Sequence, residues 1–200
     1  MSDIENIRAN HDFESEVFTR VDFGNQGMVG KNFIDCEFNI LNLANAKVSE
    51  CNFTRCTFVS SDLSMCGFDR CSMSNVSLVD CKVLGVNWAM AGLGIDVDFL
   101  RCAISYSSFS EMTLRRKRFV ECSAREVNFS HTDLRNAVFD RCDLAGSGFT
   151  GADLRGANFG TSERVFFEPK NVKLKNTVVS LDYAVTQAER LGFKVLGFTR

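Results

Sequence analysis

The amino-acid sequence predicts an all-β solenoid, a quadrilateral parallel β-helix that is followed by a short C-terminal α-helix. Three observations predict it: an apolar residue at every fifth position, a second period of twenty residues, and a small residue at one other position of each five-residue unit. A period of five matches neither the 3.6 residues of a helical turn nor the 2 of a strand. The backbone must therefore turn a corner every five residues, and four corners close a square coil.

The five-residue period runs from Phe13 to Leu93, slips by one residue, and continues from Phe99 to Phe159. Every position that it reaches is apolar, seventeen in the first run and thirteen in the second. We therefore assign residues 13–160 to the β-helix, with a one-residue register slip near 93–99. The sequence leaves open whether this slip is a bulge or a functional loop.

The twenty-residue period follows from stacking, because coils spaced at about 4.8 Å place each apolar centre above its counterpart in the coil before. One column is mostly aromatic and passes through the slip intact: Phe18, Phe38, Phe58, Leu78, Phe99, Phe119, Phe139 and Phe159. Another column is mostly aliphatic: Leu43, Leu63, Val83, Ile104, Ala124 and Leu144. The slip therefore adds one residue to the chain, but each column of apolar residues stays on the same side of the β-helix.

The residue two places before each apolar centre shares the narrow lumen with it and should be small. Of thirty such positions, 23 hold Cys, Ala, Ser, Thr or Val. All nine cysteines take this position: Cys36, Cys51, Cys56, Cys66, Cys71, Cys81, Cys102, Cys122 and Cys142. We therefore expect buried free thiols rather than a disulfide framework or a metal site. No cofactor is expected.

The composition argues against catalysis and against a membrane location. The two histidines, His11 and His131, are too far apart along the predicted rod to share one metal or to form a nucleophile–base pair. No stretch approaches eighteen apolar residues, and the N-terminus carries Asp3, Glu5 and Arg8 where a signal peptide needs an apolar run. We expect a soluble, cytoplasmic protein that is not an enzyme.

The two ends of the chain depart from the repeat. We expect residues 1–12 and 161–200 to cap the β-helix, because an open coil exposes its lumen. Ser180 is a favourable N-cap for a helix that ends before Gly192. The apolar residues of this C-terminal segment exceed what one coil end can cover, so they predict a homodimer seam. The seam residues are Leu181, Ala184, Val185, Ala188, Leu191, Phe193 and Val195.

The net charge of −2 conceals two halves of opposite sign. Residues 1–100 hold 14 acidic and 7 basic residues, whereas residues 101–200 hold 11 acidic and 16 basic. Half of a rod of roughly 36 Å would need about ten negative charges to match duplex DNA. The N-terminal half therefore imitates DNA in part. Its candidate target-facing acids are Asp22, Asp35, Glu37, Glu50, Asp62, Asp69 and Asp80.

Four successive basic residues, Arg115, Arg116, Lys117 and Arg118, interrupt this picture. Such a basic patch would repel a DNA-binding saddle, and it is either solvated surface or a contact for an acidic element or for nucleic acid. Direct nucleic-acid binding predicts a salt-sensitive affinity for DNA that is lost when the patch is neutralised. We rank this interpretation below protein binding.

Two stretches match the repeat best: Ala137-Val138-Phe139-Asp140-Arg141, and Ala152-Asp153-Leu154-Arg155-Gly156 with Ala157-Asn158-Phe159 after it. They resemble the Ala-Asp/Asn-Leu/Phe-X-X unit of the pentapeptide-repeat family, and the resemblance covers residues 13–160. This resemblance implies a right-handed quadrilateral parallel β-helix, which agrees with the usual handedness of parallel crossovers. The segments Val165 to Lys175 and Val179 to Leu181 resemble the C-terminal segment of its Qnr-like branch, and Cys81 to Trp88 is similar to its AlbG-like members.

The resemblance implies a homodimer joined through its C-terminal ends that binds a type II topoisomerase, DNA gyrase or topoisomerase IV. It further implies protection of that enzyme from quinolones or albicidin by imitation of DNA. The alternative is a structural or adaptor rod that displays one face to an unrelated protein. The sequence identifies neither the drug or toxin, nor the physiological role, nor the face that makes contact.

Overall fold

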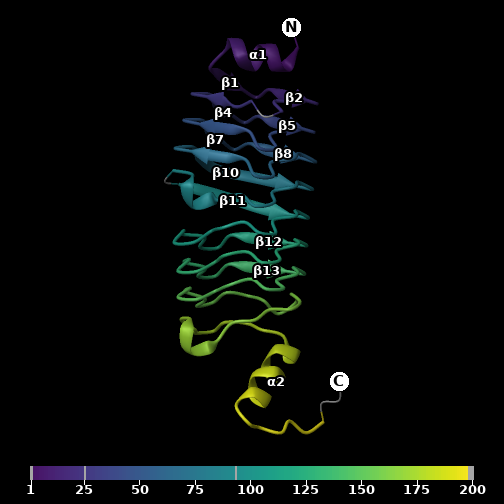
Figure 1. The fold of residues 1–200 in the computed structure, drawn as a ribbon, viewed down its shortest axis with the longest axis vertical. Helices are drawn as coiled ribbons and strands as arrows, with labels where there is room; N and C mark the ends of the chain where they lie inside the picture. The colour runs from purple at the N-terminus through teal and green to yellow at the C-terminus, as the bar shows by residue number, and fades with distance from the viewer. Residues whose placement is uncertain (1, 25, 93, 198–200) are drawn as a thin grey trace.

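The computed structural model describes residues 2–24, 26–92 and 94–197 of the chain. It is a rod of stacked coils with helix α1 (Asp3–Ala9) at one end and helix α2 (Leu181–Arg190) at the other (Figure 1). Every strand pairing between the coils is parallel. The predicted fold class, a parallel β-solenoid with a short C-terminal helix, is confirmed.

Each coil has four sides, which we number in chain order from the side that holds Phe13. Side 1 holds β1 (Asp12–Glu14), β4 (Asn32–Ile34), β7 (Asn52–Thr54) and the start of β10 (Ser72–Val79). Side 2 holds β2 (Val17–Thr19), β5 (Glu37–Asn39), β8 (Thr57–Val59), the rest of β10, most of β11 (Ile95–Leu100), β12 (Arg118–Val120) and β13 (Val138–Asp140).

Sides 3 and 4 are built with fewer strands. Side 3 consists of isolated parallel bridges that start at Asp22 and Asn42 and end at Asp143 and Glu163. Side 4 holds β3 (Met28–Val29), β6 (Lys47–Ser49) and β9 (Gly67–Asp69), and continues as bridges from Asn87 to Gly148.

The twenty-residue register is the predicted one. Phe18 pairs with Phe38 and Phe38 with Phe58, and the offset becomes twenty-one at the slip, where Leu78 pairs with Phe99. The apolar centres are buried throughout the described chain. Leu93, the last centre predicted before the slip, lies outside the described residues.

The slip is a short 3-10 turn followed by a strand with a shifted register. The turn, η1 (Trp88–Met90), leads into β11, in which Ile95, Val97 and Phe99 are all buried. Met73 pairs with Ile95 whereas Val76 pairs with Val97, so β10 has one residue more than β11 between these pairs. The extra residue before Phe99 is thus accommodated without loss of the columns.

The corners use residues with positive φ, usually two places after each apolar centre. Asn136 has a φ of 57°, in the left-handed region that Asn tolerates well. Ile40 takes the same conformation with a φ of 59°, although β-branched residues disfavour it. The shape of the coil therefore imposes the backbone conformation on whichever residue stands at the corner.

The lumen is filled by stacked rings and small side chains. Phe38 stacks on Phe58 with ring centroids 4.6 Å apart, and neighbouring columns meet edge to face, as between Phe33 and Phe38 at 5.0 Å. All nine cysteines are free and buried, in the predicted small position. Burial raises the pKa of Cys56 to about 11 and that of Cys66 to about 12.

Each end of the lumen is covered by a helix. At the N-terminal end, Ile7 of α1 is fully buried, and Lys31 donates hydrogen bonds to the carbonyl oxygens of Arg8 (3.3 Å) and Asn10 (2.5 Å). Lys31 departs from the small residues expected at its position, and these bonds explain why: it satisfies carbonyl groups at the end of α1.

At the other end, the predicted C-terminal helix is confirmed, with the hydroxyl of Ser180 accepting a hydrogen bond from the amide of Tyr183 at 3.2 Å. Phe167 lies against the last aromatic centres, 5.9 Å from Phe159, and Val185 of α2 is buried. No helix in the described part of the chain is long and apolar enough to span a membrane.

Candidate functional site

The seven candidate acids are not brought together on one face. Asp22 and Asp62 lie on side 3, Glu37 on side 2 and Asp69 on side 4. The others stand at three different corners: Asp35, Glu50 and Asp80. The acidic residues of the N-terminal half are therefore distributed around the rod.

Four of these seven acids pair with arginines. Asp35 contacts Arg55 at 2.6 Å and Asp80 contacts Arg101 at 2.6 Å, in each case one coil further along the rod. Hydrogen bonds from the guanidinium groups lower the pKa of Asp35 and of Asp80. A single arginine, Arg70, contacts the remaining two, Glu50 at 2.8 Å and Asp69 at 3.2 Å. These pairs offset part of the negative charge that the sequence assigns to this half.

The other three acids bond to neutral donors and keep their charge available. Asp22 accepts a hydrogen bond from the Asn42 side chain at 2.9 Å, and Glu37 accepts one from Asn39 at 2.6 Å. Asp62 accepts one from the backbone amide of Ser64 at 3.0 Å. Asp22 and Asp62 stand in one column of side 3, two coils apart.

The four successive basic residues do not point the same way. Arg115 pairs with Asp133 at 2.6 Å, and Lys117 pairs with Asp96 at the edge of the lumen. Arg116 stands at a corner, whereas Arg118 lies on side 2. Among the described residues, neither the Arg116 nor the Arg118 guanidinium pairs with a carboxylate, although the backbone amide of Arg118 donates a hydrogen bond to Asp98 at 2.8 Å. The predicted basic patch therefore reduces to two unpaired arginines on adjoining surfaces.

Side 1 of the C-terminal half carries an ion-pair network that the sequence analysis missed. Asp133 contacts Arg135 at 2.8 Å as well as Arg115, and Asp153 contacts Arg155 at 2.6 Å and Arg135 at 3.8 Å. Hydrogen bonds from Arg155 lower the pKa of Asp153. Opposite charges eighteen or twenty residues apart are the sequence signal that could have found such pairs, because that spacing brings side chains of adjacent coils together.

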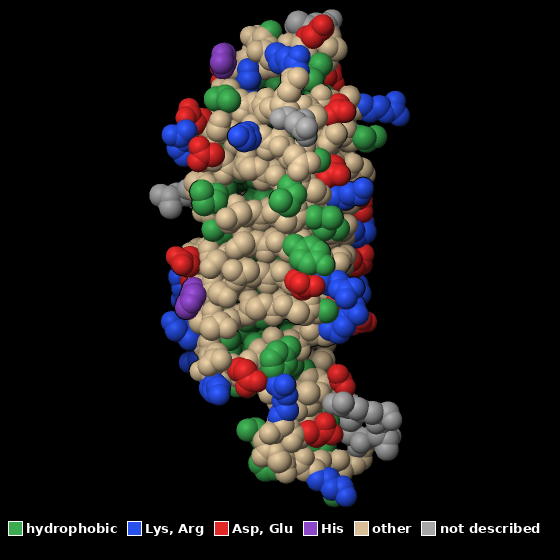
Figure 2. Space-filling view, in the orientation of Figure 1, with side chains coloured by type: hydrophobic (Ala, Val, Ile, Leu, Met, Phe, Trp, Pro, Cys, Tyr) green, Lys and Arg blue, Asp and Glu red, His purple; other side chains and the backbone are tan. Residues whose placement is uncertain are grey.

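Between residues 87 and 150, side 4 offers the opposite chemistry, because its outward residues carry no charge. These residues are small or amide-bearing: Asn87, Ala89, Ser108, Ser110, Asn128, Ser130, Gly148 and Thr150. Figure 2 shows a broad uncharged area along the rod, with most charged side chains gathered at its two edges. The rod therefore presents chemically distinct long surfaces.

The predicted dimer seam divides into a buried part and an exposed part. Val185 is buried, and Ala188 and Val195 are half-buried. Ala184 is exposed, as are three large side chains: Leu181 at 69%, Leu191 at 76% and Phe193 at 65%. Leu196, which was not among the predicted seam residues, is 82% exposed. Apolar residues thus remain uncovered after α2 has capped the lumen.

The described part of the chain was expected to bring no histidines together, and its two histidines are indeed separated. His11 and His131 are both exposed, and they lie about six coils apart along the rod. The described residues contain no group of three or more His, Cys, Asp or Glu side chains that could hold a metal ion.

The coil geometry defines a five-residue-repeat solenoid, and comparison with protein families places the chain within one such class. A model described as pentapeptide repeats (8 copies) matches residues 36–75, and one described as a pentapeptide repeat region matches residues 95–165. Together they cover more than half of the chain. The chain belongs to the pentapeptide-repeat family.

Several solved structures are similar to the chain. QnrB1, a plasmid-mediated fluoroquinolone resistance protein, is 19% identical, with 92% of this chain and 100% of that chain covered and a TM-score of 0.48. HetL, a pentapeptide repeat protein of the cyanobacterium Nostoc sp. strain PCC 7120 involved in heterocyst differentiation regulation, is 14% identical, with 90% and 93% covered and a TM-score of 0.41. No curated protein matches the chain.

Proposed function

We propose that the chain is a non-enzymatic protein-binding rod of the cytoplasm whose target is a type II topoisomerase, DNA gyrase or topoisomerase IV. It protects that enzyme from poisons such as quinolones or albicidin by occupying part of the DNA-binding surface. The observation that carries the proposal is the charge asymmetry of the rod, with an excess of acidic residues in 1–100 and of basic residues in 101–200. An acidic arm of rigid shape is what a DNA-binding groove attracts.

The positions of the unpaired carboxylates indicate which side of the rod would face the target. Asp22 and Asp62 stand in the same column of side 3, and each is held by a hydrogen bond to a neutral group. A carboxylate without a cationic partner is free to replace a DNA phosphate in contacts with Lys or Arg of the enzyme. We therefore propose side 3 of the N-terminal coils as the target-facing surface, with Glu37 at its flank.

We further propose a homodimer through the C-terminal segment. The exposed side chains of Leu181, Leu191 and Phe193 gather at one end of the rod, where α2 leaves them uncovered. A dimer joined there would place the two acidic halves at its outer ends. Sedimentation analysis should show a dimer that the double substitution Leu191→Asp and Phe193→Asp converts to a folded monomer. A wild-type chain that is monomeric at micromolar concentration would overturn the dimer.

The alternative function is a structural or adaptor rod for an unrelated protein partner. The observation that favours it is the pairing of four of the seven candidate acids with arginines, which leaves no continuous acidic face. A reproducible partner other than a topoisomerase, recovered in pull-down experiments, would support this alternative.

A topoisomerase assay tests the leading proposal. Purified protein at micromolar concentration should restore gyrase supercoiling in the presence of ciprofloxacin or albicidin, or inhibit it in their absence. The double substitution Asp22→Asn and Asp62→Asn should weaken either effect, because it removes the two unpaired carboxylates of side 3 in the N-terminal coils. The substitution Glu163→Gln, in the same column beyond the slip, is the matched control and should change little. Absence of binding, inhibition and protection would refute the proposal.

A further inference from the structure

Side 1 carries a column of basic side chains over four successive coils at the C-terminal end of the rod. Parallel backbone bonds hold these coils in register, as from Leu134 N to Asp153 O at 3.0 Å. The residue that follows the central leucine is basic in all four coils, and Lys173 adds a fifth cation. We call these residues the basic strip: Arg115, Arg135, Arg155, Lys173 and Lys175.

The acidic residues of this surface lie beneath the cations rather than beside them. The side chains of Asp133 and Asp153 are only 21% and 12% exposed, whereas those of Arg115 and Arg155 are 53% and 45% exposed. Lys175 has no acidic partner among the described residues. Five cations and two recessed carboxylates leave a net charge of +3. The surface that a partner would meet is therefore positive.

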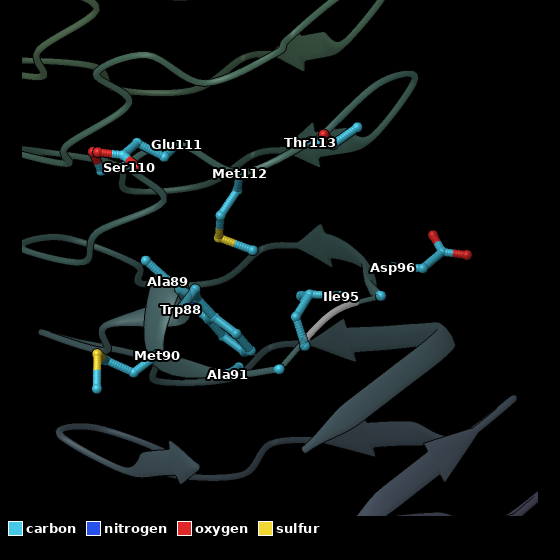
Figure 3. A pocket seen from close by; sticks show the side chains of 12 residues that line it. Trp88, Ala89, Met90, Ala91, Ile95, Asp96, Ser110, Glu111, Met112 and Thr113 are labelled. Carbon is cyan, nitrogen blue, oxygen red and sulfur yellow. The ribbon is translucent and has the colours of Figure 1, made fainter. Parts of the chain in front are cut away.

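The corners beside the basic strip add little negative charge. One corner holds Arg116, Asn136, Gly156 and Asn176, and the other holds Glu111, His131, Gly151 and Asn171. Figure 3 shows the N-terminal border of the strip, where Glu111 and Thr113 extend to opposite sides of Met112. Asp96, in the coil below, is paired with Lys117. Glu111 thus stands at the far corner, and the charge of Arg116 offsets it.

The recessed acids also fix the direction of the guanidinium groups. Asp133 accepts hydrogen bonds from Nε and Nη2 of Arg135 at 2.9 and 2.8 Å, and Asp153 accepts the same pair from Arg155 at 2.8 and 2.6 Å. No acceptor among the described residues contacts Nη1 of either arginine. The outer edge of each guanidinium is therefore free for paired bonds to a carboxylate, and its orientation is already set before binding.

The spacing of the basic strip matches an α-helix better than an extended chain. Successive coils repeat at about 4.8 Å, acidic residues one helical turn apart at about 5.4 Å, and alternate residues of an extended chain at about 6.8 Å. From Arg115 to Lys175, three coils further on, the helix departs from the column by about 2 Å and the extended chain by about 6 Å. Long Arg and Lys side chains can span the smaller difference.

Duplex DNA fits the basic strip less well than such a helix. It carries one charge per about 1.7 Å of its axis, so it would present about eight charges over the roughly 14 Å between Arg115 and Lys175. The net charge of +3 falls well short of that number. One carboxylate per helical turn, in contrast, matches one cation per coil.

We propose that the basic strip binds an α-helix of a partner protein whose exposed face carries an Asp or Glu at every turn. The helix lies along the rod, and its carboxylates meet the free edges of the guanidinium groups. The strip lies along a side of the rod rather than at the end where the dimer is proposed, so it is available in a monomer and in a dimer. The inference does not rest on a topoisomerase as target.

Acidic peptides test the proposal with the full chain. The probe is Ala-Glu-Ala-Gln-Ala-Glu-Ala-Gln-Glu-Ala-Gln-Ala-Glu-Ala-Gln-Ala, whose glutamates share one helical face, and its fluorescence anisotropy is followed through a neutral label at low salt. We expect saturable binding. The isomer Ala-Glu-Ala-Glu-Ala-Gln-Ala-Gln-Glu-Ala-Glu-Ala-Gln-Ala-Gln-Ala divides the glutamates between opposite faces and should bind at least five-fold more weakly. A single-stranded oligothymidylate of equal charge should also bind more weakly.

Substitution of arginines locates the binding site. Arg135→Gln together with Arg155→Gln should weaken peptide binding about ten-fold, because it removes two oriented cations. The matched control is Arg55→Gln together with Arg101→Gln, which removes two arginines that also pair with aspartates but lie outside the basic strip. This control should leave binding unchanged.

Two milder comparisons leave the recessed acids paired. Lys175→Gln should weaken binding about three-fold, whereas Lys47→Gln, at another exposed lysine, should not. Arg155→Lys keeps the charge but removes the fork and should weaken binding about three-fold, whereas Arg101→Lys should not. Absence of saturable binding, equal binding of the isomer, tighter binding of the oligothymidylate, or equal effects within a pair of variants would overturn the proposal.

Discussion

The coils before the slip, residues 12–79, and those after it, residues 99–160, obey the same repeat but turn their corners differently. Before the slip, short strands occupy three sides, and a backbone bond closes the corner after side 3, as from Cys66 N to Leu63 O at 3.1 Å. After the slip, such bonds also close other corners, as from Met112 N to Phe109 O at 3.2 Å and from Ala137 N to Leu134 O at 3.0 Å. A period of five residues therefore predicts where the corners lie, but not which of them are closed by a backbone hydrogen bond.

The aromatic columns differ between the two regions as well. Before the slip they occupy sides 1 and 2, where Phe33 meets Phe38 edge to face at 5.0 Å. After it they occupy sides 2 and 4, where Phe109 meets Phe119 edge to face at 5.9 Å. Sides 2 and 4 face each other across the lumen, so one ring from each side meets in the middle and fills the space between them. Side 1 then needs no ring, and its centres are leucines.

The largest expected effect tests whether the two regions are equally well packed. Phe38 and Phe119 share a column and are fully buried, with stacking partners at 4.6 Å and 4.7 Å. Replacement of either by Ala should lower the free energy of unfolding by about 3–5 kcal/mol, because it leaves a cavity that neighbouring rings cannot fill. Guanidinium titrations of Phe38→Ala and Phe119→Ala measure this. A much smaller loss for one of them would mean that its region is loosely packed.

The second largest expected effect is a loss of stability at alkaline pH. Six of the nine cysteines precede the slip, so most of this loss should come from the coils before it. Burial raises the pKa of the Cys66 thiol from 9.0 to about 12, so its stabilising contribution is complete below about pH 9 and is lost as pH rises toward 12. The loss is roughly 1.4 kcal/mol per pH unit for one such thiol. The free energy of unfolding of Cys66→Ala, followed from pH 8 to pH 11, should therefore fall less steeply than that of the wild-type chain. Equal slopes would contradict the burial argument.

Exchange of two corner residues tests the backbone conformation in each region. Ile40, before the slip, and Asn136, after it, both have positive φ and are exposed. Asn136→Ile should destabilise the fold by about 1–2 kcal/mol, and Ile40→Asn should stabilise it by up to about 1 kcal/mol, because Asn tolerates the left-handed region better. Thermal unfolding of both variants measures the two changes. A loss of stability in Ile40→Asn would show that packing of the Ile40 side chain outweighs backbone strain.

The smallest expected effect concerns the thiols as core residues. Cys56 donates a hydrogen bond to Phe33 O at 3.4 Å, and Cys142 donates one to Phe119 O at 3.3 Å. Ser162, at the same position of the repeat, donates a similar bond to Phe139 O at 2.8 Å. Cys56→Ser and Cys142→Ser should therefore each change the free energy of unfolding by less than about 1 kcal/mol. Matched Cys→Asp variants should unfold, which confirms that the position is buried.

Much of the core could be predicted from the sequence because its determinants are periodic. Phe18 and Phe159, the first and last members of one column, are both buried as the repeat requires, and Ser180 caps the helix whose spacing predicted it. The two lysines at small positions could not be explained from the sequence, since their partners are distant. Lys31 bonds to carbonyl groups near α1, and Lys117 pairs with Asp96.

The surface was predicted less well than the core. The position of an acidic residue within its unit, as for Asp35 or Asp80, indicates that it points outward but not which neighbour it meets. The pairing arises between coils, where the separation of about twenty residues has to be combined with the direction of each side chain. The acidic residues were therefore identified individually, but their distribution around the rod and their arginine partners were not.

The sequence by itself determined the β-helix, its lumen and the existence of a slip before Phe99, because a repeat of five apolar positions can be buried in few ways. Only the tertiary structure decided what the slip does. The chain makes the short turn η1, and the register with β10 then shifts between the pairs Met73–Ile95 and Val76–Val97, so that Leu78 pairs with Phe99 and the column continues. The physical reason is that backbone bonds between coils depend on the register of both coils at once, which no single repeat unit contains.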